Sequence, residues 1–171
     1  RELLKDIDYE KGYSLYVGIP FCPSICLYCS FSSSPLQRWK DQVDAYLDAL
    51  LKELDFISEA MKDRTLDTIY IGGGTPTTLE PGQLERLLGH INARFQVYQV
   101  KEYTVEAGRP DSITREKLQA IRKFPVTRIS VNPQTMNQAT LELIGRRHTV
   151  EDTRHAFALA RECGFANLNM D

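Results

Sequence analysis

Short runs of strand-forming residues alternate with longer amphipathic segments along this 171-residue chain, and this alternation constrains the fold more than any other feature. Apolar and β-branched runs of strand length recur five times, at residues 15–19, 67–71, 102–105, 127–131 and 168–170. The segments between them are long enough for the crossovers that parallel strands require. The sequence therefore predicts one α/β domain over residues 1–171, an incomplete parallel (β/α) barrel with its helices outside.

The segments between the strands carry the periodicity and the end signals of helices. Apolar residues at helical spacing predict helices over residues 41–60, 84–95, 114–124 and 137–144. One more helix begins after Thr149, because Asp152 stands three residues later and completes a capping box. Gly164 marks its end, since glycine readily adopts the left-handed conformation found just beyond a helix.

The residues with unusual chemistry follow the predicted strands. Cys22, Cys26 and Cys29 come after the first strand, residues 72–74 are three glycines after the second, and Glu106 ends the third. In parallel β/α sheets and barrels, ligands bind at the carboxyl ends of the strands. We therefore expect these loops to form one common site.

The three clustered cysteines are separated by three and then by two residues. Three thiolates hold three irons of a cubane cluster and leave the fourth iron open to an exogenous ligand. The alternative is a zinc-stabilised interaction domain, but structural zinc takes four ligands, usually from two paired knuckles, and the sequence has no second pair. Cys163 lies late in a predicted helix and is interpreted as a buried free thiol.

Composition excludes several function classes. The net charge of −2 gives no electrostatic attraction to nucleic acid or anionic lipid, and no apolar run reaches membrane-spanning length. The charged start, Arg1–Lys5, does not resemble a signal peptide, which predicts a cytoplasmic protein. Because the chain begins without Met and ends in a strand, we expect a fragment with a lead-in over residues 1–13, truncated after strand five.

Two motifs together resemble a known family. Cys22-Pro-Ser-Ile-Cys26-Leu-Tyr-Cys29 and Gly72-Gly-Gly-Thr-Pro76 are similar to the signatures of the radical S-adenosylmethionine superfamily. From about Ser14 onward the chain resembles its oxygen-independent coproporphyrinogen III oxidase (dehydrogenase) family. This resemblance implies a barrel of the radical S-adenosylmethionine type, with a [4Fe–4S] cluster on the three cysteines and S-adenosylmethionine on the open iron. The reduced cluster would cleave the cofactor to a 5′-deoxyadenosyl radical, with an electron donor of the flavodoxin or ferredoxin class.

The resemblance also implies roles for residues near the first two strands. Tyr16 matches a family tyrosine near the cofactor and is a candidate catalytic residue, although it is equally interpretable as an ordinary strand aromatic. Gly72, Gly73 and Gly74 match the segment whose backbone carbonyls accept the methionyl amino group, and Thr75 follows them. A tight strand-to-loop turn is the alternative for these glycines, and both roles are compatible.

Three charged residues on later strands complete the predicted site. Glu106 matches a family glutamate at the cofactor and is the second candidate catalytic residue. Arg128 matches an arginine that pairs with the cofactor carboxylate, a contact suited to its two-pronged donor geometry. Asp171 corresponds to a strand-five aspartate near the ribose. The alternative for Glu106 and Arg128 is a structural salt bridge within the barrel.

The expected reaction is that of the family. It is the oxidative decarboxylation of two propionates of coproporphyrinogen III to vinyl groups, giving protoporphyrinogen IX in anaerobic haem synthesis. Two departures keep a haem chaperone open as the alternative. Gly18 stands where many members have histidine, and Phe31 replaces the fourth cysteine of the Gram-negative enzymes.

Overall fold

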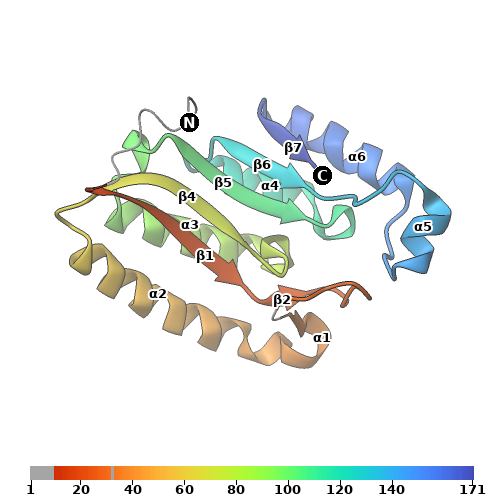
Figure 1. Cartoon of the computed structure of the whole chain (residues 1–171), viewed down its shortest axis with the longest axis horizontal. Coiled ribbons are helices and arrows are strands. Elements are labelled where there is room, and N and C mark those ends of the chain that lie inside the picture. The colour runs from red at the N-terminus through yellow and green to blue at the C-terminus, as the bar shows by residue number, and fades with distance from the viewer. Residues whose placement is uncertain (1–9, 32) are drawn as a thin grey trace.

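The computed structural model describes residues 10–31 and 33–171, and within them five parallel strands form one sheet in the order β1-β4-β5-β6-β7 (Figure 1). Their bounds are β1 Gly12–Ile19, β4 Thr65–Gly73, β5 Glu102–Gly108, β6 Arg128–Val131 and β7 Leu168–Met170. Each strand pairs in parallel with the strand before it in the sheet, so the predicted parallel α/β architecture is confirmed.

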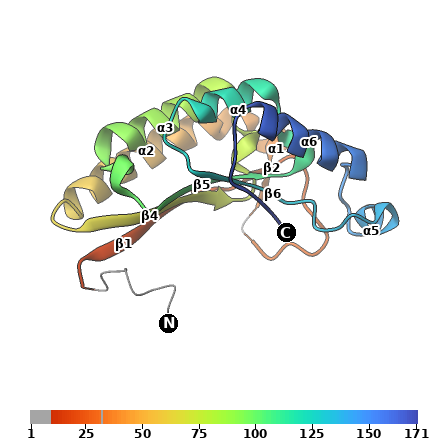
Figure 2. The ribbon, with the colours of Figure 1, turned by 90° about the horizontal axis from the view of Figure 1, so that it is seen from above.

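The longer helices of the described residues lie on one face of this sheet (Figure 2). The main ones are α2 Val43–Ala60, α3 Pro81–Arg94, α4 Arg115–Arg122 and α6 Val150–Glu162. The short helices are α1 Leu36–Trp39 and α5 Gln138–Leu143, and 3-10 turns span Lys40–Gln42, Pro76–Thr78, Val97–Gln99 and Pro110–Ser112. A further two-residue pair, β2 Phe21–Cys22 and β3 Ser34–Pro35, lies beyond β1.

The core forms between the sheet and these helices. Along β1, Leu15, Val17 and Ile19 are buried and alternate with partly or fully exposed residues, as expected for a strand with one covered face. They pack in one cluster with buried leucines of α2 and α3, such as Leu47 and Leu88. Burying each such side chain stabilises the fold by about 1.5–3 kcal/mol.

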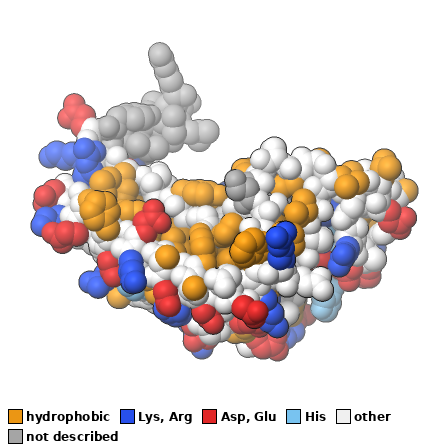
Figure 3. All heavy atoms as spheres, turned by 90° about the horizontal axis from the view of Figure 1, so that it is seen from below, with side chains coloured by type: hydrophobic (Ala, Val, Ile, Leu, Met, Phe, Trp, Pro, Cys, Tyr) orange, Lys and Arg blue, Asp and Glu red, His pale blue; other side chains and the backbone are white. Residues whose placement is uncertain are grey.

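The opposite face of the sheet is polar and aromatic. Tyr16 and Tyr70 stack there, with ring centroids 5.9 Å apart and planes inclined by 7°. Tyr16 lies on the edge strand β1 and is 59% exposed. Hydrophobic side chains gather in a band on the surface that Figure 3 shows. Leu27, Phe31 and Trp39 are among the large hydrophobic residues that are exposed in the described part of the chain.

Most predicted elements are confirmed, and the end signals of α6 are confirmed in detail. Thr149 and Asp152 form the capping box, and Gly164 has φ +87° just beyond the helix. The first strand starts earlier than predicted, at Gly12 instead of Leu15, and residues 1–9 of the predicted lead-in lie outside the described part. The short elements α1, β2 and β3 were not predicted, since they are too short to show periodicity. No helix of the described residues is long and apolar enough to span a membrane.

Candidate cluster and cofactor site

A cavity of about 240 Å³ lies at the carboxyl ends of β4, β5 and β6, under residues 22–29, which we call the cysteine loop. The lining includes most of the residues predicted from sequence: Cys22, Cys26, Cys29, Gly73, Gly74, Thr75, Glu106 and Asp171. It also includes residues given no role before, namely Ser24, Tyr28, Arg109, Asn132, Gln134 and Arg146. The loops after separate strands therefore meet in one place, as expected for a parallel sheet.

The three cysteines of the loop are free thiols at different depths. Cys22 is buried at the end of β2, and Cys26 and Cys29 are partly exposed. Burial raises the pKa of the Cys22 thiol, while the hydroxyl of Thr75, 3.5 Å from its sulfur, lowers it. The amide of Cys29 donates to the carbonyl of Cys26 at 3.1 Å, which closes a turn between these two cysteines.

The cysteines do not form a single-ion site in this geometry. Among the described residues, no three side chains of His, Cys, Asp or Glu converge closely enough to hold one metal ion. A cubane cluster binds its three thiolates through three different irons, so it does not require that convergence. Three thiols around one cavity, whose described lining contains no histidine and no fourth cysteine, fit such a cluster better than structural zinc.

The cysteine loop is held by the segment between α5 and α6. The amide of Leu27 donates to the carbonyl of Ile144 at 3.2 Å. The guanidinium of Arg146 donates to the hydroxyl of Tyr28 from Nη2 at 2.9 Å. Gly145 has φ +78°, and a Cβ on it would stand 3.3 Å from the side chain of Leu27. The turn that follows α5 thus forms one wall of the cysteine loop.

The glycine segment after β4 allows the backbone to approach the cysteine loop closely. Gly73 has φ +108°, and a Cβ there would stand 2.9 Å from the backbone nitrogen of Ile19. At Gly74 a Cβ would lie 2.8 Å from the carbonyl oxygen of Phe21 and 2.9 Å from the sulfur of Cys22. Gly73 thus has a backbone conformation that larger residues rarely adopt, Gly74 has no room for a side chain, and both line the cavity. The two interpretations left open by the sequence are therefore compatible here.

Glu106 faces the cavity from β5. Burial and the nearby Asp171 carboxylate raise the pKa of Glu106 from 4.5 to about 7, although the backbone N–H of Gly73 and the charge of Arg146 oppose this. The amide of Asn132 donates to its Oε1 at 3.3 Å. A carboxyl group with a strongly raised pKa in a cleft is typical of a functional site.

Asp171 lies at the same rim, held by two amides. Asn132 donates to its Oδ2 at 3.0 Å and Gln134 at 2.7 Å. Gln134 adopts φ +72°, an uncommon backbone conformation for a residue other than glycine. This strained conformation is tolerated because the side chain is held by Asp171 at the cavity wall.

Three predicted site residues lie outside this cavity. The Cβ of an alanine at Gly72 would meet the Tyr70 ring and Glu106, so Gly72 provides space beside the carboxyl group. Tyr16 lines an adjoining hollow of about 260 Å³ that shares Gly73 and Gly74 with the main cavity. Arg128 pairs with Glu102 at 3.1 Å and donates to the Thr104 hydroxyl at 3.0 Å. The structural salt bridge considered from sequence is thus present, but its carboxylate is Glu102.

A residue that sequence reasoning missed is Arg109. Its guanidinium is 3% exposed and forms an ion pair with Asp111 at 2.7 Å. It also donates from Nη1 to the hydroxyl of Ser24 at 2.7 Å, across 85 residues of sequence. The sequence around Arg109 carries no signal for a contact so distant along the chain.

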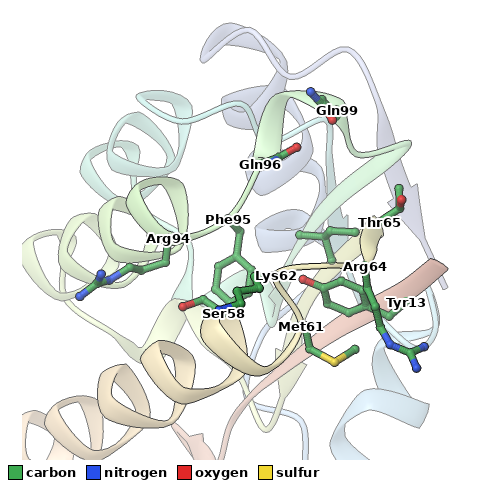
Figure 4. Close-up of a pocket in the computed structure, with 11 residues that line it drawn as sticks. Tyr13, Ser58, Met61, Lys62, Arg64, Thr65, Arg94, Phe95, Gln96 and Gln99 are labelled. Carbon is green, nitrogen blue, oxygen red and sulfur yellow. The ribbon is translucent and has the colours of Figure 1, made fainter. Parts of the chain in front are cut away.

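A second cavity, of about 190 Å³, lies at the opposite end of the sheet (Figure 4). The start of β1 and β4 lines it through Tyr13 and Thr65, with Phe95 and three basic side chains around it. Two of these are neutralised, because Lys62 pairs with Glu59 and Arg94 with Asp55. Its lining contains none of the predicted site residues.

The chain was compared with known proteins. The family model described as "Radical SAM superfamily" matches residues 16–171. The chain is 44% identical to the oxygen-independent coproporphyrinogen-III oxidase-like protein HemZ of Bacillus subtilis, over 92% of this chain and 32% of that protein. It is 40% identical to the heme chaperone HemW of the same organism, over 92% of this chain and 41% of the relative.

A solved structure supports the same assignment. Coproporphyrinogen III oxidase (HemN) from Escherichia coli, described as a radical SAM enzyme, superposes with a TM-score of 0.80 and 32% identity. The superposition covers 94% of this chain and 37% of that one. This chain therefore spans roughly a third to two fifths of the length of the relatives it matches.

Proposed function

This chain belongs to the radical SAM superfamily, whose members use a [4Fe–4S] cluster and S-adenosylmethionine, and we propose that Cys22, Cys26 and Cys29 ligate that cluster. The observation that carries the proposal is the cysteine loop closing over a cavity lined by Gly73, Gly74 and Glu106. When bound, the reduced cluster supplies one-electron cleavage of the cofactor to a carbon radical that removes a hydrogen atom from substrate.

The protein's own groups position the cofactor in this proposal. Backbone carbonyls of Gly73 and Gly74 and the carboxylate of Glu106 accept hydrogen bonds from its amino group. Ionised Glu106 suits that contact because an ammonium group compensates the charge that burial otherwise disfavours. Asp171, which two side-chain amides hold at the rim of the cavity, accepts hydrogen bonds from the ribose hydroxyls. The Thr75 hydroxyl contacts the sulfur of Cys22 and fixes the position of this cluster ligand. Tyr16 closes the adjoining hollow.

For the whole protein, we propose oxidative decarboxylation of two propionates of coproporphyrinogen III to the vinyl groups of protoporphyrinogen IX, with loss of carbon dioxide and an electron from each after hydrogen abstraction. Similarity to HemZ and HemN supports this reaction. An electron donor of the flavodoxin or ferredoxin class would reduce the cluster. We place the reaction in the cytoplasm, where cysteines remain reduced.

The second candidate is a haem chaperone that keeps the cluster without this dehydrogenation. The 40% identity to HemW favours it specifically, and so does Phe31, which lies 71% exposed where the Gram-negative enzymes have a fourth cysteine. Product analysis separates the two functions. The full-length protein is incubated anaerobically with coproporphyrinogen III, S-adenosylmethionine and a reductant. Protoporphyrinogen supports the enzyme, whereas stoichiometric haem binding without product supports the chaperone.

The cluster assignment has its own test. Anaerobic reconstitution should give about four iron and four sulfide per chain, and replacing Cys22, Cys26 or Cys29 with Ala should abolish stable cluster, because two thiolates do not anchor a cubane. Cys163→Ala is the matched control, since Cys163 lies at the end of α6 on the helical side of the sheet. Iron loss in Cys163→Ala together with full iron in Cys26→Ala would contradict the assignment.

A further inference from the structure

Arg109 carries a buried positive charge that has no role in the proposal so far. It follows β5 directly, and its side chain is 3% exposed. Asp111 occupies one side of the guanidinium, because Nε donates to Oδ1 at 2.9 Å and Nη2 donates to Oδ2 at 2.7 Å. This two-pronged pair fixes the plane of the group and leaves Nη1 free to reach elsewhere.

The free end of Arg109 binds the cysteine loop between its first two cysteines. Nη1 donates to the carbonyl of Ser24 at 3.0 Å and to its hydroxyl at 2.7 Å. The same nitrogen lies 4.0 Å from the sulfur of Cys26. The loop is therefore tied on one side to the end of β5 and on the other, through Leu27 and Ile144, to the end of α5.

We propose that Arg109 is a positioning residue that holds the cysteine loop in its cluster-binding conformation and, through its charge, makes the bound cluster easier to reduce. This inference rests on the proposed cluster site. Reduction adds negative charge to the cluster and its thiolates, and a fixed cation beside one ligand sulfur stabilises that state. The low exposure of the guanidinium strengthens this interaction, because charges interact more strongly away from solvent, while the Asp111 carboxylate on the other side of the group offsets part of it.

The two parts of this role make separable predictions. Arg109→Gln removes both the charge and most of the donor fork, whereas Arg109→Lys retains the charge and loses the fork. Ser24→Ala removes only one acceptor of the loop contact. Arg115→Gln is the matched control, because Arg115 forms an exposed pair with Glu162 on the helical side of the sheet.

The test uses full-length protein reconstituted anaerobically. The readouts are iron per chain, the half-life of the cluster with excess chelator, and the midpoint potential from a spectroscopic titration. Outer contacts of metal ligands typically contribute 10–100-fold in affinity, so we expect Arg109→Gln to shorten the half-life about 10-fold and to shift the potential to a more negative value. Arg109→Lys should shorten the half-life but keep the potential near that of the wild type, and Arg115→Gln should match the wild type in both.

A wild-type half-life and potential in Arg109→Gln would overturn the inference. If that variant fails to fold, as judged by a thermal melt of the iron-free protein, the cluster half-lives of Arg109→Lys and Ser24→Ala decide the question. Wild-type half-lives in both would overturn it equally. Failure of the wild-type protein to take up about four iron would instead refute the proposed function.

Discussion

Replacing Glu106 by Gln should make the cofactor-free protein more stable at alkaline pH and leave its stability unchanged at acidic pH. Glu106 is partly buried beside Asp171, and its pKa is raised from 4.5 to about 7. The folded state therefore favours the protonated carboxyl group, whereas the unfolded chain ionises it near pH 4.5. Glutamine has nearly the shape of the protonated group and does not ionise.

The sign and magnitude follow from the two pKa values. Below pH 4.5 both states carry the proton, so the substitution has no electrostatic effect. As the pH rises towards 7, only the unfolded state loses its proton, so the wild-type protein loses stability, and above 7 the loss is complete. A difference of about 2.5 pKa units at about 1.4 kcal/mol each sets an upper bound of roughly 3.5 kcal/mol. Because the side chain is partly exposed, we expect about 1–2 kcal/mol.

Thermal melts of the iron-free protein, followed by circular dichroism between pH 5 and pH 8, measure this effect. In a chain of this size each kcal/mol raises Tm by about 2–4 °C, so Glu106→Gln should exceed the wild type by roughly 4 °C at pH 8 and by little at pH 5. Glu142→Gln, an exposed carboxyl group on α5, is the control. Parallel curves for Glu106→Gln and wild type over the whole range would refute the reasoning.

Three further predictions concern the turn, the sheet face and the last helix. Gly74→Ala should lower the iron content after reconstitution by more than half, because the added Cβ would press on the cysteine loop. Gly82→Ala is the control and should keep full iron, since a Cβ there meets nothing within 4 Å. Equal iron in both variants would contradict the close-approach argument. Arg128→Lys should destabilise the protein by about 1 kcal/mol through loss of a hydrogen bond, and its affinity for S-adenosylmethionine should stay within twofold of that of the wild type. A large loss of affinity at unchanged Tm would favour the cofactor contact predicted from sequence. Thr149→Ala should cost about 1 kcal/mol in a urea titration, and an unchanged midpoint would show that the capping box contributes nothing.

The fold was predictable because its signals are local. The capping box of Thr149 and the left-handed Gly164 each act within a few residues, and strand runs alternate with helical periodicity throughout. Parallel pairing then brings the ends of the strands together, which explains why the cysteines and Glu106 could be assigned to one cavity before the structure was known.

The contacts inside the site were less predictable because they depend on side-chain direction and on distant partners. Arg128 was expected either at the cofactor or paired with Glu106, yet the register places Thr104 beside it and Glu102 within reach. Strand alternation gives the face of a residue but not its depth along the barrel. The contact between Arg109 and Ser24 spans 85 residues, and neither local pattern nor composition indicates it.

The strand order has a consequence for synthesis on the ribosome. Within the five-stranded sheet, each strand pairs with the strand of that sheet that was synthesised before it. The sheet can therefore grow at one edge as the nascent chain emerges. The thiols are made early, but the cysteine loop gains its contact with Arg109 only after β5 and its contact with Ile144 only after α5. Ribosome-stalled chains from which residues up to about 150 have emerged should therefore take up much more iron than chains from which residues up to about 100 have emerged. Equal uptake by the shorter chains would show that the cluster is inserted before these contacts form.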